Sequence, residues 1–254
     1  MTTPLAVMQR YRNLKVKAVI EDEVAMMSRP GEIPVTLRKY FMMNWADGTE
    51  QRRDFNKVTR GSKHDVWFTE NKPRILNAAM GKGAPEDYEL ALEWAVRSGK
   101  IKDVNQSTLQ AFCDEHLGID CSGFVTNYLI AAGKKTYSSK VVRNTGAASY
   151  YSVARAVNDA SRIRPGHLLV WMRGNAVKRR PGHIAVVQSY VPRSIAGGNI
   201  RVVEATGSSG AKPKLLDSMY TVERIIDKGG RAPVMILVVK RHGRSGSRVA
   251  VMRW

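Results

Sequence analysis

The sequence of 254 residues contains little cysteine, few acidic residues and no long apolar run. Its two cysteines, Cys113 and Cys121, are too few to form a disulfide framework or a zinc site with four cysteine ligands. Because no run of about eighteen apolar residues occurs, the sequence predicts no membrane-spanning helix. Polar and basic residues, beginning at Gln9 and Arg10, interrupt the first apolar residues, so no secretory signal peptide is predicted. We therefore expect synthesis in the cytoplasm and, for any exported molecules, a signal-independent secretion system.

Acidic residues are scarce in comparison with basic ones, which leaves a net charge of +19. Such a balance predicts an anionic partner, such as peptidoglycan, another acidic polymer or an anionic lipid surface. A dedicated nucleic-acid module is disfavoured, because the sequence has no zinc-finger spacing, RNA-binding aromatic motif or long basic helix. A solvated basic surface without a partner is the alternative.

Cys121 lies in the segment Gly118-Ile119-Asp120-Cys121-Ser122-Gly123-Phe124-Val125, at the expected start of a helix. Asp120 is a suitable N-cap, because its carboxylate can accept hydrogen bonds from N–H groups of the first turn. The positive end of the helix dipole then favours the thiolate of Cys121, which is the nucleophilic form. Cys113 lies in an amphipathic segment and is expected to be a small buried hydrophobic residue. The alternatives for Cys121 are a buried structural cysteine and a disulfide with Cys113.

A cysteine nucleophile needs a base, and the base needs a group that orients it. Of the five histidines, His183 is the best placed, because Pro181 and Gly182 end a loop and an apolar run typical of a strand follows. Residues 200–205 form the next predicted strand. If the two strands pair as a hairpin, Glu204 lies near His183 and can orient the imidazole. A loop-ending polar histidine and a solvated acid are the alternatives.

These residues together resemble the NlpC-type cell-wall peptidases, a branch of the papain-like cysteine hydrolases. Asp120 to Val125 resembles the nucleophile motif, Arg164 to Trp171 corresponds to the strand that follows, and Gly182 to Ala185 resembles the segment that supplies the base. Glu204 corresponds to the third catalytic position. The resemblance covers about residues 87–240, and it implies Cys121, His183 and Glu204 as catalytic residues, with no metal and no organic cofactor.

The sequence departs from this family at three positions. His167 replaces the usual aspartate, and Glu204 stands where the family more often has histidine, asparagine or glutamine. The family also carries a tyrosine upstream of the cysteine that lines the oxyanion site, and the nearest upstream tyrosine here, Tyr88, is not a clear match. We expect His167 to be a structural residue at the start of a strand, with a second active-site histidine as the alternative.

The resemblance implies a cysteine hydrolase that cleaves amide bonds in the peptide stems of peptidoglycan. Asp120, Ser122, Gly182 and Arg180 are expected to border the substrate. The charge and the missing signal peptide suggest an exported antibacterial effector or a lysin, with an immunity protein or a component of a secretion machine as a further partner. Two alternatives stay open: a Cys–His acyltransferase, deamidase or transglutaminase acting on a protein or lipid, and a catalytically silent basic binding module.

The order of predicted elements indicates an α+β fold of the papain-like, NlpC type, with helices packed on an antiparallel sheet. Helices are expected at Leu5–Met27, Pro85–Ser98, Asn105–Leu117 and Phe124–Ala132. Strands are expected at His167–Met172, His183–Val191, Ile200–Ala205 and Val234–Lys240. Residues 1–84 are expected to form an N-terminal extension, residues 85–240 the hydrolase core, and residues 241–254 a basic C-terminal tail.

Overall fold

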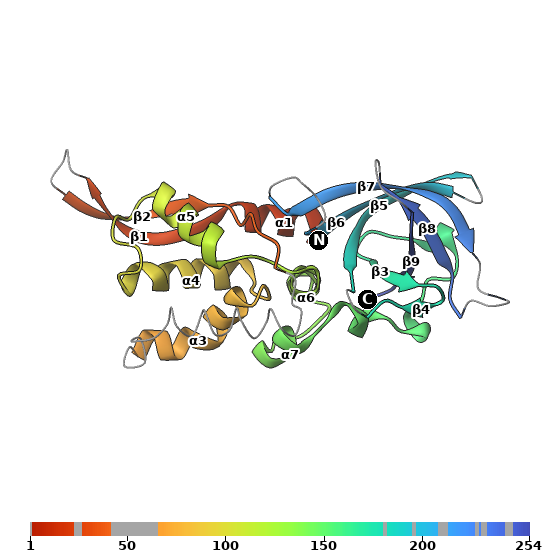
Figure 1. The fold of residues 1–254 in the computed structure, drawn as a ribbon, viewed down its shortest axis with the longest axis horizontal. Helices are drawn as coiled ribbons and strands as arrows, with labels where there is room; N and C mark the ends of the chain where they lie inside the picture. The colour runs from red at the N-terminus through yellow and green to blue at the C-terminus, as the bar shows by residue number, and fades with distance from the viewer. Residues whose placement is uncertain are drawn as a thin grey trace.

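Six antiparallel strands close into a barrel at one end of the molecule (Figure 1). The computed structural model describes residues 2–22, 27–41, 66–179, 182–194, 197–207, 213–226, 229, 233–241 and 246–254. The barrel strands are, in spatial order, β3 (Leu168–Arg173), β5 (Ile184–Ser194), β6 (Gly197–Ala205), β7 (Leu215–Ile226), β8 (Ile236–Lys240) and β9 (Ser247–Met252). A short strand, β4 (Ala176–Val177), extends the sheet beside β3.

This closure shows that the expected fold class is wrong. The predicted papain-like, NlpC-type α+β fold has helices layered on an antiparallel sheet, whereas here β3 pairs with β9, as in Leu168 with Met252 and Val170 with Ala250. Two barrel strands, β7 and β9, were missing from the sequence prediction, and β9 lies in the segment 241–254 that was expected to be a tail. Pairing between the outermost strands satisfies backbone groups that an open sheet would leave exposed at its edges.

Strand β3 is apolar on both faces, because its alternate residues join two different hydrophobic clusters. Leu169 and Trp171 belong to a cluster formed almost wholly by strand residues, with a few contributions from the loop before β3. Leu168 and Val170 belong to a second and larger cluster that continues into the helices. This second face therefore joins the barrel and the helical part in one continuous core.

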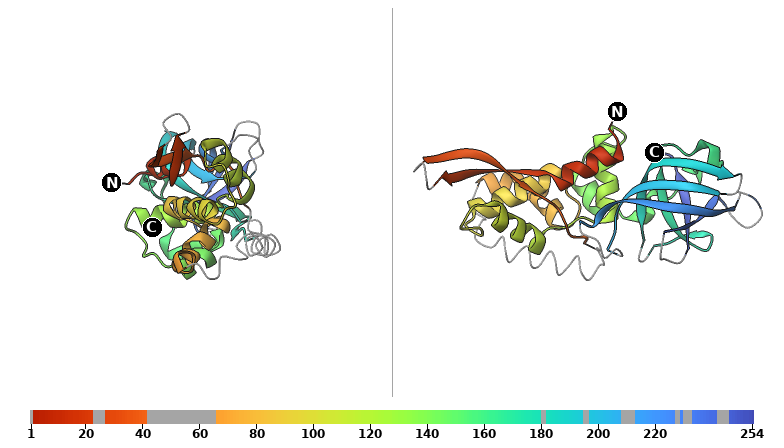
Figure 2. Two further views of the ribbon diagram at one scale, coloured as in Figure 1. Left: turned by 90° about the vertical axis from the view of Figure 1, so that its left-hand side faces the viewer. Right: turned by 90° about the horizontal axis from the view of Figure 1, so that it is seen from above.

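The helices and a two-stranded hairpin form the other end of the molecule, and the helix that begins at Cys121 lies between them and the barrel (Figures 1 and 2). The α-helices are α1 (Pro4–Arg12), α3 (Val66–Ala79), α4 (Pro85–Arg97), α5 (Gln106–His116), α6 (Cys121–Ala131) and α7 (Ser139–Asn144). The hairpin consists of β1 (Leu14–Asp22) and β2 (Met27–Val35). Short 3-10 helices follow at Ala147–Tyr150, Val153–Arg155 and Ala160–Arg162.

The helices expected at Pro85–Ser98 and Asn105–Leu117 are confirmed to within one residue at each end. The helix expected at Leu5–Met27 is wrong beyond Arg12, because the chain continues into β1. Buried Leu14 and Val16 alternate with Lys15 and Lys17 there, and this period of two favours a strand.

The N-terminal residues pack on the rest of the chain. Helix α1 contacts α6 and the barrel strands β5, β6 and β7, while α3 packs on α4. The structure therefore places the expected boundary between residues 84 and 85 inside a continuous core. Among the described residues, no helix is long and apolar enough to cross a membrane.

Candidate active site

Cys121 begins α6, as the sequence predicts. The preceding residue, Asp120, has an extended backbone, and its carboxylate accepts a hydrogen bond from the backbone N–H of Gly123. This is the expected N-cap, which places the Cys121 side chain beside the positive end of the helix. The cysteine is largely buried, with 5% of its surface exposed, and neither it nor Cys113 forms a disulfide.

The first turn of α6 packs closely against the loop between α3 and α4. A Cβ atom at Gly123 would lie 2.1 Å from the backbone oxygen of Gly81, so only glycine fits at this position. The side-chain nitrogen of Asn127, one turn further along α6, donates to the backbone oxygens of Lys82 and Gly83 at 2.8 and 2.9 Å. The start of the helix therefore has a fixed position relative to this loop.

His183 and Glu204 meet on neighbouring strands of the barrel. Strands β5 and β6 pair with Val186 opposite Val203, which brings the residue before β5 to the end of β6. The Nε2 atom of His183 lies 2.7 Å from the Oε2 atom of Glu204. The expected hairpin and the expected contact between these two side chains are thus confirmed.

Cys121 lies near the imidazole of His183 and interacts with it electrostatically. Burial opposes a charged ring, but the hydrogen bonds and negative charges of Cys121 and Glu204 outweigh it and raise the pKa of His183 to about 10. The arrangement favours the charged, imidazolium form of His183.

Glu204 is held by several donors in addition to His183. Tyr220 Oη donates to its Oε1 atom at 2.9 Å, and Arg241 donates to the same oxygen at 3.2 Å. Burial would raise the pKa of this carboxyl, but its hydrogen bonds with His183, Ser218 and Tyr220 lower it instead. Glu204 is therefore a buried carboxylate that stays ionised and keeps one oxygen on the imidazole.

Trp171 on β3 packs against the other side of the base. Its ring meets the His183 ring edge to face, with centroids 4.4 Å apart. The backbone N–H of Trp171 also donates to the backbone oxygen of His183 at 3.1 Å. Together with Glu204, this contact restricts the imidazole to one orientation.

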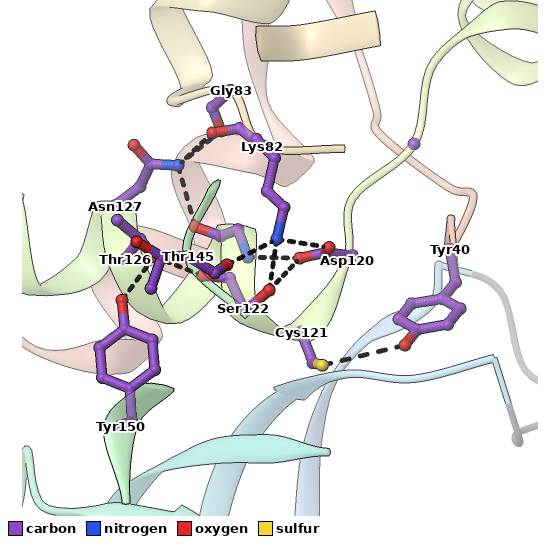
Figure 3. A network of polar contacts seen from close by, with 12 residues as sticks. Tyr40, Lys82, Gly83, Asp120, Cys121, Ser122, Thr126, Asn127, Thr145 and Tyr150 are labelled. Carbon is purple, nitrogen blue, oxygen red and sulfur yellow. Dashed lines mark hydrogen bonds and ion pairs between the residues drawn. The ribbon is translucent and has the colours of Figure 1, made fainter. Parts of the chain in front are cut away.

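Tyr40 is a residue of the site that the sequence did not predict. Its hydroxyl lies 3.9 Å from the Cys121 sulfur and points toward it (Figure 3). Burial, followed by the charge of Cys121, raises the pKa of the Tyr40 hydroxyl well above its usual range, so the hydroxyl keeps its proton. Tyr88, the upstream tyrosine considered from the sequence, is buried elsewhere and donates to the backbone oxygen of Gly118 at 2.7 Å.

The segment 38–41 carries Tyr40 between the two halves of the site. This segment forms two backbone hydrogen bonds with Ile119, the residue just before the N-cap. The oxygen of Lys39 accepts from the N–H of Ile119, and the N–H of Phe41 donates to the oxygen of Ile119. On the other side, the oxygen of Arg38 accepts a hydrogen bond from Lys214, which itself pairs with Thr206 just after β6. Nothing local to residue 40 in the sequence signals this position, since it depends on contacts with distant segments.

The remaining predicted residues take different positions. Asp120 and Ser122 are buried and bonded within the protein, Gly182 directly precedes His183, and Arg180 lies outside the described residues. His167 is half-buried at the turn before β3, where its Nδ1 atom accepts from the backbone N–H of Arg164 at 3.2 Å. This contact matches the structural role expected for His167.

Within the described part of the chain, no group of three or more His, Cys, Asp or Glu side chains is placed to hold a metal ion. Comparisons with protein-family models, curated proteins and solved structures found no match.

Proposed function

We propose that this protein is a cysteine hydrolase that cleaves amide bonds in the peptide stems of peptidoglycan. The observation that carries the proposal is the position of His183, which lies near Cys121 and hydrogen bonds to the buried carboxylate of Glu204. A thiol, a base and an orienting acid in contact are the parts that nucleophilic acyl chemistry needs. The substrate class rests on the resemblance of residues 120–125 and 182–185 to the NlpC-type peptidases.

In the first half-reaction, the thiolate of Cys121 attacks the carbonyl carbon of the amide. The backbone N–H of Cys121 and the hydroxyl of Tyr40 are the proposed donors to the oxyanion that forms. The imidazolium of His183 then protonates the leaving amine as the carbon–nitrogen bond breaks. The products of this step are a free amine and a thioester on Cys121.

In the second half-reaction, neutral His183 takes a proton from a water molecule, and the resulting hydroxide attacks the thioester. Collapse of this intermediate releases the carboxylic acid and returns the thiolate–imidazolium pair. Glu204 keeps the ring in one orientation through both steps and stabilises its positive charge. Each turnover consumes one water and converts one amide into an acid and an amine.

The positive charge of the chain supports an acidic polymer as the substrate, because peptidoglycan stems carry free carboxylates. Lys178 and Arg179 lie close to the base in the chain, and their backbone oxygens pack around Gly182. We propose that this basic loop, with Arg180, attracts the stem carboxylates. An exported effector or lysin that acts on the cell wall fits this charge, with an immunity protein as a partner of the effector.

The proposal is tested by incubating purified peptidoglycan fragments with the wild type, Cys121→Ala and Cys113→Ala. Cys113 is fully buried away from the site, so its variant is a matched control for the loss of a thiol. Mass spectrometry should show fragments that gain one water with the wild type and Cys113→Ala, and no change with Cys121→Ala. Exchange of the amine without water uptake would indicate an acyltransferase, and unchanged fragments with all three proteins would contradict the proposal.

A further inference from the structure

Lys82 is a buried cation close to the candidate nucleophile. It lies in the loop between α3 and α4, and only 3% of its surface is exposed. Its ammonium forms an ion pair with Asp120 at 2.7 Å, and it also donates to Ser122 Oγ and to the backbone oxygen of Thr145 at 3.0 Å (Figure 3). A lysine ammonium has three N–H donors, so these three acceptors satisfy it completely.

Asp120 has two opposing effects on Cys121. As the N-cap, its Oδ1 atom accepts from Gly123 N–H and from Ser122 Oγ, which fixes the first turn of α6. As a carboxylate in the residue directly before Cys121, it also brings a negative charge to the start of α6, and a nearby negative charge opposes the formation of a thiolate. Lys82 binds the other oxygen, Oδ2, and brings a compensating positive charge to the same place.

The other ionisable groups around Cys121 come from separate elements. Tyr40 approaches from the segment 38–41, and His183 lies near Cys121 from the residue before β5. Glu204 and Arg241 lie behind His183 and pair with each other at 3.2 Å. Among these described groups, Lys82 is the cation that pairs with the carboxylate of Asp120 and compensates its negative charge. Arg241, the other cation, pairs with Glu204 instead.

We propose that Lys82 is a positioning residue of the site, which holds Asp120 as the N-cap of α6 and cancels the charge that Asp120 places beside Cys121. The catalytic meaning of this role rests on the proposed hydrolase function. Lys82 does not touch the sulfur, and it acts through Asp120 and Ser122. Without Lys82, the negative charge of Asp120 would oppose the formation of the Cys121 thiolate, although Asp120 as the N-cap places Cys121 at the start of the helix.

The test measures the rate of alkylation of Cys121 by iodoacetamide between pH 5 and 10 on the folded full chain. Mass spectrometry of the peptide that contains Cys121 gives the midpoint at which the thiolate forms. Lys82→Met keeps the length of the side chain and removes its charge. We expect its midpoint to lie about one pH unit above that of the wild type, which corresponds to an alkylation rate about tenfold lower below the midpoint.

A double variant, Lys82→Met with Asp120→Asn, removes both charges and keeps an N-capping side chain. Its midpoint should return to within about 0.3 pH unit of the wild type, because coupled residues give non-additive effects. Arg74→Met is a matched control, since Arg74 pairs at 2.6 Å with another buried carboxylate at a helix start, that of Asp87. This control should lower the melting temperature without moving the alkylation midpoint.

A folded Lys82→Met chain with the wild-type midpoint would overturn the proposal and leave Lys82 a purely structural role. A double variant shifted upward as far as Lys82→Met would also overturn it, because Lys82 would then act independently of Asp120. If Lys82→Met does not fold, Asp120→Asn alone decides, because it leaves the charge of Lys82 without its partner: its midpoint should fall below that of the wild type, and an unchanged midpoint would overturn the proposal. The measurement uses no substrate, so these results stand apart from the peptidoglycan assay, and failure of either proposal can be recognised separately.

Discussion

The Nε2 atom of His183 lies 2.7 Å from the Oε2 atom of Glu204, and the carboxylate is almost fully buried while the imidazole keeps 18% of its surface exposed. The acid is thus enclosed in the barrel, and the base extends from it toward Cys121 on α6. Because the barrel supplies the base and the helix supplies the nucleophile, the site depends on the contact of α6 with β5 and β6.

The contact between His183 and Glu204 predicts that loss of His183 lowers the rate of hydrolysis more than loss of the Glu204 charge does. His183→Ala should reduce hydrolysis by about a hundredfold or more, the usual scale of acid–base catalysis, because the base is needed in both half-reactions. Glu204→Gln keeps the shape and one acceptor oxygen, but the neutral amide no longer stabilises the imidazolium. Its activity should therefore lie between those of the wild type and His183→Ala, as measured by kcat/KM on a soluble muropeptide.

His167→Ala is the matched control, because His167 is bonded at the turn before β3 and contacts neither Cys121 nor Glu204 in the interactions described. It should keep nearly the full activity. An inactive His167→Ala combined with an active His183→Ala would mean that the assignment of the base is wrong.

The two cysteines should differ strongly in reactivity. Burial raises the pKa of the Cys113 thiol to about 12, whereas Cys121 begins a helix and lies near His183. Brief treatment with iodoacetamide near neutral pH should modify Cys121 well before Cys113, because the thiolate is the reactive form. Peptide mapping by mass spectrometry measures the ratio. Faster labelling of Cys113 in the native protein would contradict the choice of nucleophile.

The parts of the site that depend on short-range sequence could be predicted. Asp120 and Cys121 follow from the preferences of a helix start, and the contact of His183 with Glu204 follows from a hairpin between adjacent strands. Tyr40 could not be predicted, because it reaches Cys121 from 81 positions earlier in the chain. Its place depends on backbone bonds to Ile119 that have no local sequence signal.

The closure of the barrel could not be predicted for a similar reason. Strand β9 pairs with β3, so the residues that meet are far apart in the sequence. Arg248 and Ser247 at the start of β9 also continue the basic, polar character of the preceding residues, which favoured a tail. In β7, exposed Asp217, Thr221 and Glu223 follow the period of two of a strand, but a buried polar residue, Ser218, and an exposed apolar one, Met219, reverse the expected pattern in its middle. Tertiary contacts outweigh these local preferences.

Tyr40→Phe tests the role of the hydroxyl near the nucleophile. The ring of Tyr40 packs closely against Gly207, because a Cβ atom added to that glycine would lie 2.7 Å from the ring. Phenylalanine keeps the ring and this contact, so the variant should keep the fold. Loss of one oxyanion donor is expected to lower kcat by about a hundredfold while KM changes little. Tyr88→Phe, which removes a buried hydroxyl away from the sulfur, is the control that should affect stability more than kcat. An unchanged kcat in Tyr40→Phe would remove Tyr40 from the mechanism.

The raised pKa of His183 predicts how stability depends on pH. The pKa of about 10 in the folded protein lies above the ordinary histidine value of 6.5, so the stabilisation is complete below pH 6.5 and is lost as the pH rises through 10. Within this window the unfolded chain releases the proton and the folded chain keeps it. The free energy of unfolding should therefore fall, by at most about 1.4 kcal/mol per pH unit from this group.

Urea unfolding of the wild type and His183→Ala at pH 6.5, 8 and 9.5 measures this contribution, since their difference cancels most other titrating groups. The difference should shrink as the pH rises. His167→Ala is again the control, because burial lowers the pKa of His167, the opposite direction to that of His183. A difference between wild type and His183→Ala that stays constant would show that His183 is not protonated in the folded protein.

The last prediction concerns the net charge of +19. If this charge concentrates the protein on an acidic polymer, activity on intact cell walls should fall as salt rises, because exposed charges are screened over a Debye length of about 8 Å at physiological ionic strength. Turnover of a small soluble muropeptide should change much less, since Cys121, His183 and Glu204 are largely buried. Initial rates on both substrates across a salt series measure the difference.

Neutralising the basic loop, with Lys178, Arg179 and Arg180 all changed to Gln, should reproduce part of the salt effect on intact walls. The matched control neutralises Lys72, Lys100 and Lys102, which are exposed in α3 and in the turn after α4, at the other end of the molecule from the barrel (Figure 1). Both variants lose the same charge, so a larger effect of the loop variant would locate the attraction near the base. Equal salt sensitivity on both substrates would instead mean that salt acts on the chemistry itself, and insensitivity on both would leave the basic surface without a polymer partner.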